Sequence, residues 1–131
     1  MIGSSLLDTT IVVSILRRKV TFEEGIRGYP TFFLNAVVLS ELHVGLVETY
    51  SPRQEAYLEQ ILKRTAVLSV TEDTALHHAV AKAALRKAGT PIPENDIWIA
   101  ASAIEHGLTL ITYDRHFEKV GGLRLDLQIK P

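Results

Sequence analysis

Residues 93–112, PENDIWIAASAIEHGLTLIT, decide the fold class, because they join a predicted helix to a strand of the kind that parallel sheets bury. The helix is expected over 96–105 and ends before Gly107. The strand, 108–112, is almost wholly apolar, as strands that are covered on both faces are. Asp96 stands at the entrance of the helix, where an aspartate can cap the helix or bind a metal ion. The stretch therefore predicts an α/β protein and raises the question of what Asp96 does.

The rest of the chain repeats this alternation of short strands and helices. Strands joined by helices form crossover units, which imply a mainly parallel central sheet with helices on both faces. Pro52 suits the first position of one helix, and Asn35 can cap another. The predicted strands are residues 5–7, 32–34, 65–70, 108–112 and 123–129, and the predicted helices are 11–18, 36–49, 52–64, 72–88 and 96–105.

Both ends of the alanine-rich helix carry recognisable signals. Thr71 can cap its start, and Glu72 and Asp73 place negative charge in the first turn, which the helix dipole favours. Thr74 stands where a capping box would have glutamate or glutamine, so no capping box is expected. Gly89 follows the last helical residue, in the place where glycine commonly ends a helix.

Length and composition are those of one globular domain, which we expect to span residues 1–131. Charged residues make up 22% of the chain and the net charge is -1, so a basic coat for nucleic acid is excluded and any RNA contact must be local. The absence of cysteine excludes disulfides and thiolate metal sites. No apolar run approaches the roughly 18 residues of a membrane span, and Asp8 interrupts the N-terminal apolar residues before a signal sequence can form. We therefore expect a cytoplasmic protein.

Four acidic residues are predicted to lie near one edge of the sheet. Asp8 follows the first strand and Asp114 comes just after the fourth, while Glu41 lies in the helix that leaves the second strand. The carboxyl ends of parallel strands face the same edge, so these three share it, and Asp96 joins them if its helix also begins there. Each acid alone has a structural explanation, as a cap, a turn residue or a solvated side chain. That explanation is weakest for Glu41, because its helix is apolar on most faces, is expected to be substantially buried, and has no lysine or arginine to pair with it.

Four segments of the chain resemble a known family. They are LLDTT at 6–10, SELHVG at 40–45, IPENDIWIAASA at 92–103 and HGLTLITYDRHFEKVGGL at 106–123. Their order and spacing are similar to those of PIN-domain ribonucleases of the VapC toxin type, and the resemblance runs from one end of the chain to the other. Thr10 stands where this family usually has asparagine or serine, and it keeps a polar oxygen there.

The resemblance implies a PIN-like fold in a single domain and hydrolysis of RNA phosphodiester bonds with Mg²⁺ or Mn²⁺. It assigns Asp8, Asp96 and Asp114 to the metal, and Glu41 either joins them or orients the attacking water. Two carboxylates about 4 Å apart repel by about 4 kcal/mol at an effective dielectric of about 20, so four of them need protons or a cation to coexist. Hard oxygen ligands favour Mg²⁺ or Mn²⁺, and one or two ions per site are equally compatible with the sequence.

Other residues around the acids are also expected to contribute. Thr9 and Thr112 are expected to hold the carboxylates by hydrogen bonds. Arg115 is the residue expected to contact RNA. The run Arg17-Arg18-Lys19 is a weaker candidate, since a helix C-terminus favours cations by itself. His116 is expected to be a surface residue.

The resemblance also implies two protein partners, a small antitoxin that covers the acidic site and a second copy of the chain in a homodimer. Three alternatives stay open: a PIN-domain ribonuclease that processes RNA outside a toxin–antitoxin pair, a PIN fold that only binds or assembles, and a receiver-like signalling domain. The receiver-like domain would need paired acids after the first strand, where Asp8 is followed by two threonines.

Overall fold

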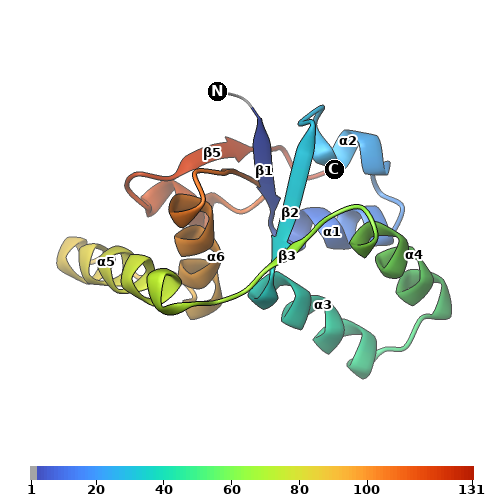
Figure 1. The fold of residues 1–131 in the computed structure, drawn as a ribbon, viewed down its shortest axis with the longest axis horizontal. Helices are drawn as coiled ribbons and strands as arrows, with labels where there is room; N and C mark the ends of the chain where they lie inside the picture. Colours follow the sequence, from blue (N-terminus) through green and yellow to red (C-terminus); the bar gives the residue numbers. More distant parts are fainter. Residues whose placement is uncertain (1–2) are drawn as a thin grey trace.

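The computed structural model describes residues 3–131. They fold around a central five-stranded sheet in which all neighbouring strands are parallel (Figure 1). The expected domain of residues 1–131 thus begins with two positions outside the described range. The order across the sheet is β3-β2-β1-β4-β5, and the predicted α/β class with a mainly parallel sheet is confirmed. The strands are β1 Ser4–Leu7, β2 Thr31–Asn35, β3 Val67–Leu68, β4 Thr109–Thr112 and β5 Arg124–Leu127.

Within residues 3–131, six α-helices and one 3-10 helix connect the strands. In Figure 1, α5 and α6 lie to the left of β1 and β2, and α1, α2 and α4 lie to their right, so helices flank the sheet on both sides. None of the helices in this described part combines the length and apolar character that a membrane span requires. The helices are α1 Thr9–Leu16, α2 Phe22–Ile26, α3 Ala36–Glu48, α4 Pro52–Leu62, α5 Glu72–Ala88, α6 Glu94–Glu105 and η1 Arg115–Lys119.

The central strands β1 and β4 supply the middle of the hydrophobic core. Leu6 and Leu7 on β1 and Leu110 and Ile111 on β4 are fully buried, which is why these strands are apolar on both faces. Each such side chain contributes about 1.5–3 kcal/mol relative to an exposed position. The helix α6 adds a run of small and branched buried residues, which lets its backbone pack closely against its neighbours. These residues are Ile97, Ile99, Ala100, Ala101 and Ala103.

The helices α5 and α6 run antiparallel, which decides where α6 begins. At one end of the pair, the Thr74 hydroxyl donates to Glu105 Oε1 at 2.6 Å. At the other end, Lys82 Nζ lies 2.8 Å from Glu94 Oε2. The first turn of α6 therefore lies near the segment that follows β4, where Asp96 meets His116. The sequence alone did not determine whether the helix of Asp96 begins at the carboxyl edge of the sheet. In the structure, the connection from α5 to α6 brings Asp96 to that edge.

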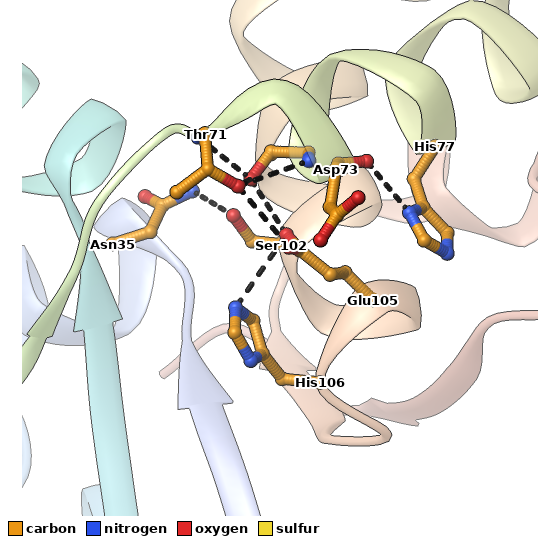
Figure 2. A network of polar contacts seen from close by, with 8 residues as sticks. Asn35, Thr71, Asp73, His77, Ser102, Glu105 and His106 are labelled. Carbon is orange, nitrogen blue, oxygen red and sulfur yellow. Dashed lines mark hydrogen bonds and ion pairs between the residues drawn. The ribbon is translucent and has the colours of Figure 1, made fainter.

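Figure 2 shows the polar network that fixes α6 against the starts of α3 and α5. The side chain of Asn35, the last residue of β2, accepts the Val38 N–H at 2.8 Å, so it caps α3 as predicted. The same side chain donates from Nδ2 to Ser102 Oγ on α6 at 3.1 Å, and both residues are fully buried. One asparagine thus ends a strand, begins a helix and anchors a second helix.

The prediction that α5 lacks a capping box was wrong. The Thr71 hydroxyl accepts the Thr74 N–H at 3.4 Å, and the Thr74 hydroxyl accepts the Thr71 N–H at 3.0 Å. Threonine can replace the usual glutamate because its hydroxyl still reaches the free N–H group of the first turn. The same hydroxyl also donates to Glu105, so the cap is continuous with the contact between α5 and α6.

Other element boundaries also differ from prediction. The helix α2, which was not predicted, has only five residues, too few to show a helical period, and it begins with a capping box of Thr21 and Glu24. The strand β3 is Val67–Leu68 rather than 65–70. The helix α6 begins at Glu94 with Pro93 at the N-cap position, so Asp96 lies in the first turn and does not cap the helix.

The expectation that α3 is substantially buried was also wrong. Only Val38 and Leu42 are buried, and Glu41 is partly exposed. The side chains of Val44 and Val47 are 53% and 84% exposed. Figure 1 shows the reason, since the second half of α3 extends beyond the sheet instead of lying on it.

Candidate active site

Asp8 is the most buried of the four acids, with 3% of the residue exposed. It follows β1, and its backbone N–H donates to Ile111 O on β4 at 3.0 Å. Its carboxylate makes no cap bond to α1 but accepts from the hydroxyls of Thr10 and Thr112 at 2.8 and 2.7 Å. Burial raises the pKa of Asp8, and these two hydroxyl donors counter the rise. The carboxylate is therefore held by the loop after β1 and the end of β4.

Thr112 connects Asp8 to Asp114. While its hydroxyl donates to Asp8, its oxygen accepts the Asp114 N–H at 2.9 Å. Asp114 Oδ1 in turn accepts the His116 N–H at 2.9 Å, which closes the turn into η1. The hydroxyl of one fully buried threonine at the end of β4 thus holds both acids, Asp8 at its carboxylate and Asp114 at its backbone N–H.

Asp96 reaches the same place from the first turn of α6, and its side chain is 15% exposed. Burial, followed by the negative charges of Asp8 and Asp114, raises the pKa of Asp96 to about 6, while a hydrogen bond from His116 opposes the rise. His116 Nδ1 lies 3.5 Å from Asp96 Oδ2 and 3.0 Å from Asp114 Oδ1. One carboxylate oxygen of Asp96, one of Asp114 and one ring nitrogen of His116 lie within 4.8 Å of one another, and Asp8 and Glu41 are not part of this group.

Glu41 lies at the margin of this group. Its Oε1 accepts from the Thr9 hydroxyl at 2.6 Å, and its Oε2 faces Asn95 Nδ2 at 3.5 Å. Its charge adds to the causes that raise the pKa values of Asp8 and Asp96. Glu41 is thus coupled to the other acids, but it is held on the side where α3 meets the start of α6.

The chemistry of the donor set fits a divalent metal ion. Within residues 3–131, no lysine or arginine nitrogen lies within 4.0 Å of a carboxylate oxygen of the four acids. Burial first, and then the charges of Asp8 and Asp114, raise the pKa of Asp96, so an ionised carboxylate is costly at this place without a cation. Carboxylate oxygens are the ligands that Mg²⁺ and Mn²⁺ prefer.

The structure places Asp96 and Asp114 in one group with His116, while Asp8 and Glu41 lie outside that group but near enough for their charges to raise the pKa of Asp96. Thr9 and Thr112 donate hydrogen bonds to Glu41 and Asp8 in the manner expected. Arg115 follows Asp114, but its exposed guanidinium pairs with Glu118 at 2.9 Å. His116 is exposed as expected, with 46% of its side chain accessible, and its ring also lies against two of the acids, a contact that was not predicted.

Two further contacts were not assigned from sequence. Thr10 Oγ1 replaces the family's usual asparagine or serine as a donor to Asp8. Asn95 approaches Glu41 from the residue before Asp96. Thr10 is a polar residue two positions after Asp8, and this could have indicated its contact with that acid. Nothing in the sequence indicated the contact of Asn95 with Glu41.

A comparison with protein families finds that the PIN domain matches residues 5–123. This range takes in β2, β3 and β4, all of β1 except Ser4, and the four acids, and it ends just before β5. The chain therefore belongs to the PIN-domain family.

Within that family, the similar characterised proteins carry the name VapC. "Ribonuclease VapC2" of Haemophilus influenzae is 33% identical over 125 residues, which cover 92% of this chain and 95% of the relative. "tRNA(fMet)-specific endonuclease VapC" of Shigella flexneri is 31% identical over 125 residues, with the same coverage of 92% and 95%.

A solved structure agrees with this placement. In the crystal structure of DNA-bound VapBC from Salmonella typhimurium, one chain superposes with a TM-score of 0.84 at 28% identity, covering 96% of this chain and 98% of that one. The likeness in sequence and in fold thus extends over nearly the whole length of both proteins.

Proposed function

We propose that this protein is a metal-dependent endoribonuclease that hydrolyses RNA phosphodiester bonds, and that it is the toxin of a toxin–antitoxin pair. The observation that carries the proposal is that Asp96 and Asp114 converge with His116, that Thr112 links Asp114 to Asp8, and that no lysine or arginine lies beside these acids in the described chain. Membership of the PIN-domain family and likeness to proteins named as ribonucleases support the same chemistry.

The three aspartates would hold Mg²⁺ or Mn²⁺. A divalent ion bound there would lower the pKa of a water molecule. It would also offset the negative charge on the phosphate oxygens in the transition state. Asp8 is the most firmly fixed of the three, because two hydroxyls and a strand-end N–H set its position. The hydrogen bonds from Thr112 and Thr10 oppose the rise in the pKa of Asp8 and fix the orientation of its carboxylate for a cation.

Glu41 is suited to one of two roles. It either joins the aspartates at the ion or accepts a proton from the attacking water as the new bond to phosphorus forms and the bond to the leaving oxygen breaks. Thr9 donates to Oε1 of Glu41 and leaves Oε2 with only the longer contact to Asn95. Arg115, exposed beside Asp114, would contact the RNA after exchanging its pairing with Glu118 for a phosphate.

Partners and setting follow from this proposed activity. The Salmonella VapBC structure supports an antitoxin partner for this chain too, and we propose that such a partner covers the acidic site. The exposed apolar side of α3 supports a homodimer. We propose a cytoplasmic location, because a ribonuclease would encounter cellular RNA there. Because all strands of residues 3–131 join one sheet, we propose that they act as a single PIN domain.

The direct test is incubation of the purified protein with labelled RNA in Mg²⁺, in Mn²⁺ and in EDTA. Cleavage should require the metal and should be abolished in Asp96→Asn. The matched control is Asp73→Asn, which changes an exposed aspartate in the first turn of α5 and should leave cleavage unchanged. Because a similar protein is named for action on an initiator tRNA, the RNA set should include that molecule. Metal-independent cleavage, or full activity of Asp96→Asn, would refute the proposed site.

A second function, RNA processing outside a toxin–antitoxin pair, needs its own experiment. Expression of the toxin should arrest growth, and Asp8→Ala should relieve the arrest. An active ribonuclease that can be expressed without harm would support processing instead.

A further inference from the structure

Beside the acidic cluster lies a groove of about 380 Å³ that three distant segments build. The helix α1 and its C-terminal end form one side, the turn after β4 forms a second, and the C-terminal residues form a third. Figure 1 shows the C-terminus in the neighbourhood of α1 and α2, which agrees with this arrangement. Asp114 is in its lining, so the groove opens directly from the proposed metal site.

Four cations line this groove, although the whole chain has a net charge of -1. They are Arg17, Lys19, Arg115 and Lys130. Within the described residues, only Arg115 has an acidic partner within 4.0 Å. The helix dipole explains Arg17 and Lys19 at the end of α1, but it does not explain cations from η1 and from the C-terminal segment facing the same space. Such a local concentration of positive charge fits a polyanion.

Tyr113 lines the same groove and gives it an aromatic surface. Its backbone N–H donates to Thr10 Oγ1 at 3.4 Å, which holds the residue next to the loop that carries Asp8. Aromatic side chains among cations are the combination with which proteins bind single-stranded nucleic acid, because every base has a face that can stack. A duplex is too wide for a pocket of this volume, which is in the range of sites that enclose small ligands.

We infer that this groove binds the single-stranded segment of RNA adjacent to the cleaved phosphate, with the backbone along Arg17, Lys19 and Lys130 and one base against Tyr113. The inference rests on the proposed ribonuclease function and specifies where its substrate lies. It makes these four residues substrate-binding groups, distinct from the acids that would hold the metal.

The test measures binding of a fluorescently labelled single-stranded RNA oligonucleotide by anisotropy in EDTA, so that no cleavage occurs. The double variant Arg17→Gln/Lys19→Gln should bind at least about 10-fold more weakly, and the slope of log Kd against log salt should fall by about 1.4, or 0.7 for each cation on a single strand. Lys130→Gln should lower the slope by about 0.7. The matched control is Arg86→Gln/Lys87→Gln, which removes two cations from the last turn of α5, and it should change neither quantity.

Tyr113 is tested by two substitutions. Tyr113→Phe keeps the aromatic face and should retain affinity, whereas Tyr113→Leu should lose about 10-fold, within the range measured for base–aromatic stacking. Equal affinity of the leucine and phenylalanine variants would show that no base stacks on the ring of Tyr113. With RNA and Mg²⁺, Arg17→Gln/Lys19→Gln should raise KM and leave kcat near that of the parent.

The outcomes separate the inference from the function on which it rests. If the parent protein cleaves RNA and the groove variants bind and cleave as the α5 control does, the groove assignment is wrong and the ribonuclease stands. If the parent protein does not cleave RNA with any divalent ion, the proposed function fails first. An acidic peptide of the same charge that bound equally well through the same cations would show that the groove takes a protein segment instead of RNA.

Discussion

Asp8 and Asp96 meet at the same edge of the sheet but are stabilised differently. Asp8 is the more buried, yet two hydroxyls donate to it and oppose the rise in its pKa. Within residues 3–131, Asp96 accepts no hydrogen bond from a hydroxyl, and the His116 ring lies 3.5 Å from its carboxylate. The energetic cost of the acidic cluster is therefore concentrated on Asp96, whose pKa rises to about 6.

This raised pKa predicts how metal-free stability depends on pH. Because the pKa of Asp96 is about 6 in the folded protein and 3.8 for an aspartate free in water, the folded state holds the proton more tightly than the unfolded state. Between these values stability falls as pH rises, so the protein without metal should lose about 1–3 kcal/mol between pH 4 and 7 from this group. Asp96→Asn should remove most of that loss. Urea denaturation in EDTA across this range measures it, with Asp73→Asn as the control.

A metal ion should reverse the trend. Addition of Mg²⁺ above pH 6 should stabilise the parent protein and leave Asp96→Asn nearly unchanged, because the ion replaces the proton that Asp96 would otherwise hold. If stability depends on pH in the same way in the parent protein and in Asp96→Asn, the ionisation of Asp96 is not what destabilises the metal-free protein.

Thr112 offers a second prediction at the scale of one residue. Thr112→Val removes the donor to Asp8 and the acceptor for the Asp114 N–H in a fully buried position. Activity should fall about 10- to 100-fold, as for other residues that orient metal ligands, and stability by about 1–3 kcal/mol. The pKa of Asp8 should rise, so the acidic limb of the activity profile should move to higher pH. Thr31→Val, at an exposed threonine that begins β2, is the control for loss of a strand hydroxyl.

The residues of the site differ in how far sequence could place them. The position of an acid after a parallel strand follows from topology, so Asp8 and Asp114 could be located without coordinates. His116 could not, because its ring direction depends on η1, a five-residue turn with no period to read. The role of Thr10 depends on whether its hydroxyl turns back to Asp8, which is a rotamer choice that packing makes.

At the scale of elements, the position of Asp96 depends on how α6 is fastened. Thr74 is fully buried, and its hydroxyl serves both the α5 cap and Glu105 of α6. Figure 2 shows Glu105, which accepts this bond, beside the Asn35–Ser102 pair, so the far end of α6 is held at two points. These contacts at the C-terminal end of α6 therefore help to fix the direction of the helix and the position of Asp96 in its first turn.

Thr74→Val tests this anchor. Valine has nearly the same shape but leaves the Glu105 carboxylate without its 2.6 Å donor, so stability should fall by about 1–3 kcal/mol. Metal affinity should fall less than in Thr112→Val, because Thr74 does not touch the acids. Calorimetric Mg²⁺ titration and urea unfolding separate the two effects. Thr49→Val, at the exposed end of α3, should change neither.

Elements were predictable where a period or an apolar run was long enough. The helices α4 and α5 have 11 and 17 residues, and their spacing was clear in the sequence. The helix α2 and the strand β3 have five and two residues, too few for a pattern to form. For β3, the β-branched sequence around Val67 favoured a longer strand, but its length is set by pairing with the end of β2 alone.

For the whole molecule, the free side of α3 predicts self-association. Val44 and Val47 on α3 are 53% and 84% exposed, and Tyr50, two residues beyond the end of the helix, is 62% exposed. Val47→Lys should weaken the proposed homodimer at least about 10-fold without loss of stability, because the side chain has little burial to lose in a single copy. Analytical ultracentrifugation measures the change. Ile129→Lys replaces another highly exposed apolar residue and should leave association unchanged, and a parent protein that is monomeric at all concentrations would refute the dimer.

The two borders of the sheet determine what kind of contact such a dimer can use. One border is β3, with two residues, and the other is β5, where Arg124 and Asp126 place opposite charges along four residues. Short or charged borders prevent neighbouring copies from joining main chain to main chain, which is the usual route to uncontrolled assembly. Copies of this protein can therefore meet through helical surfaces while their backbones stay separate, and a partner can be exchanged without opening the sheet.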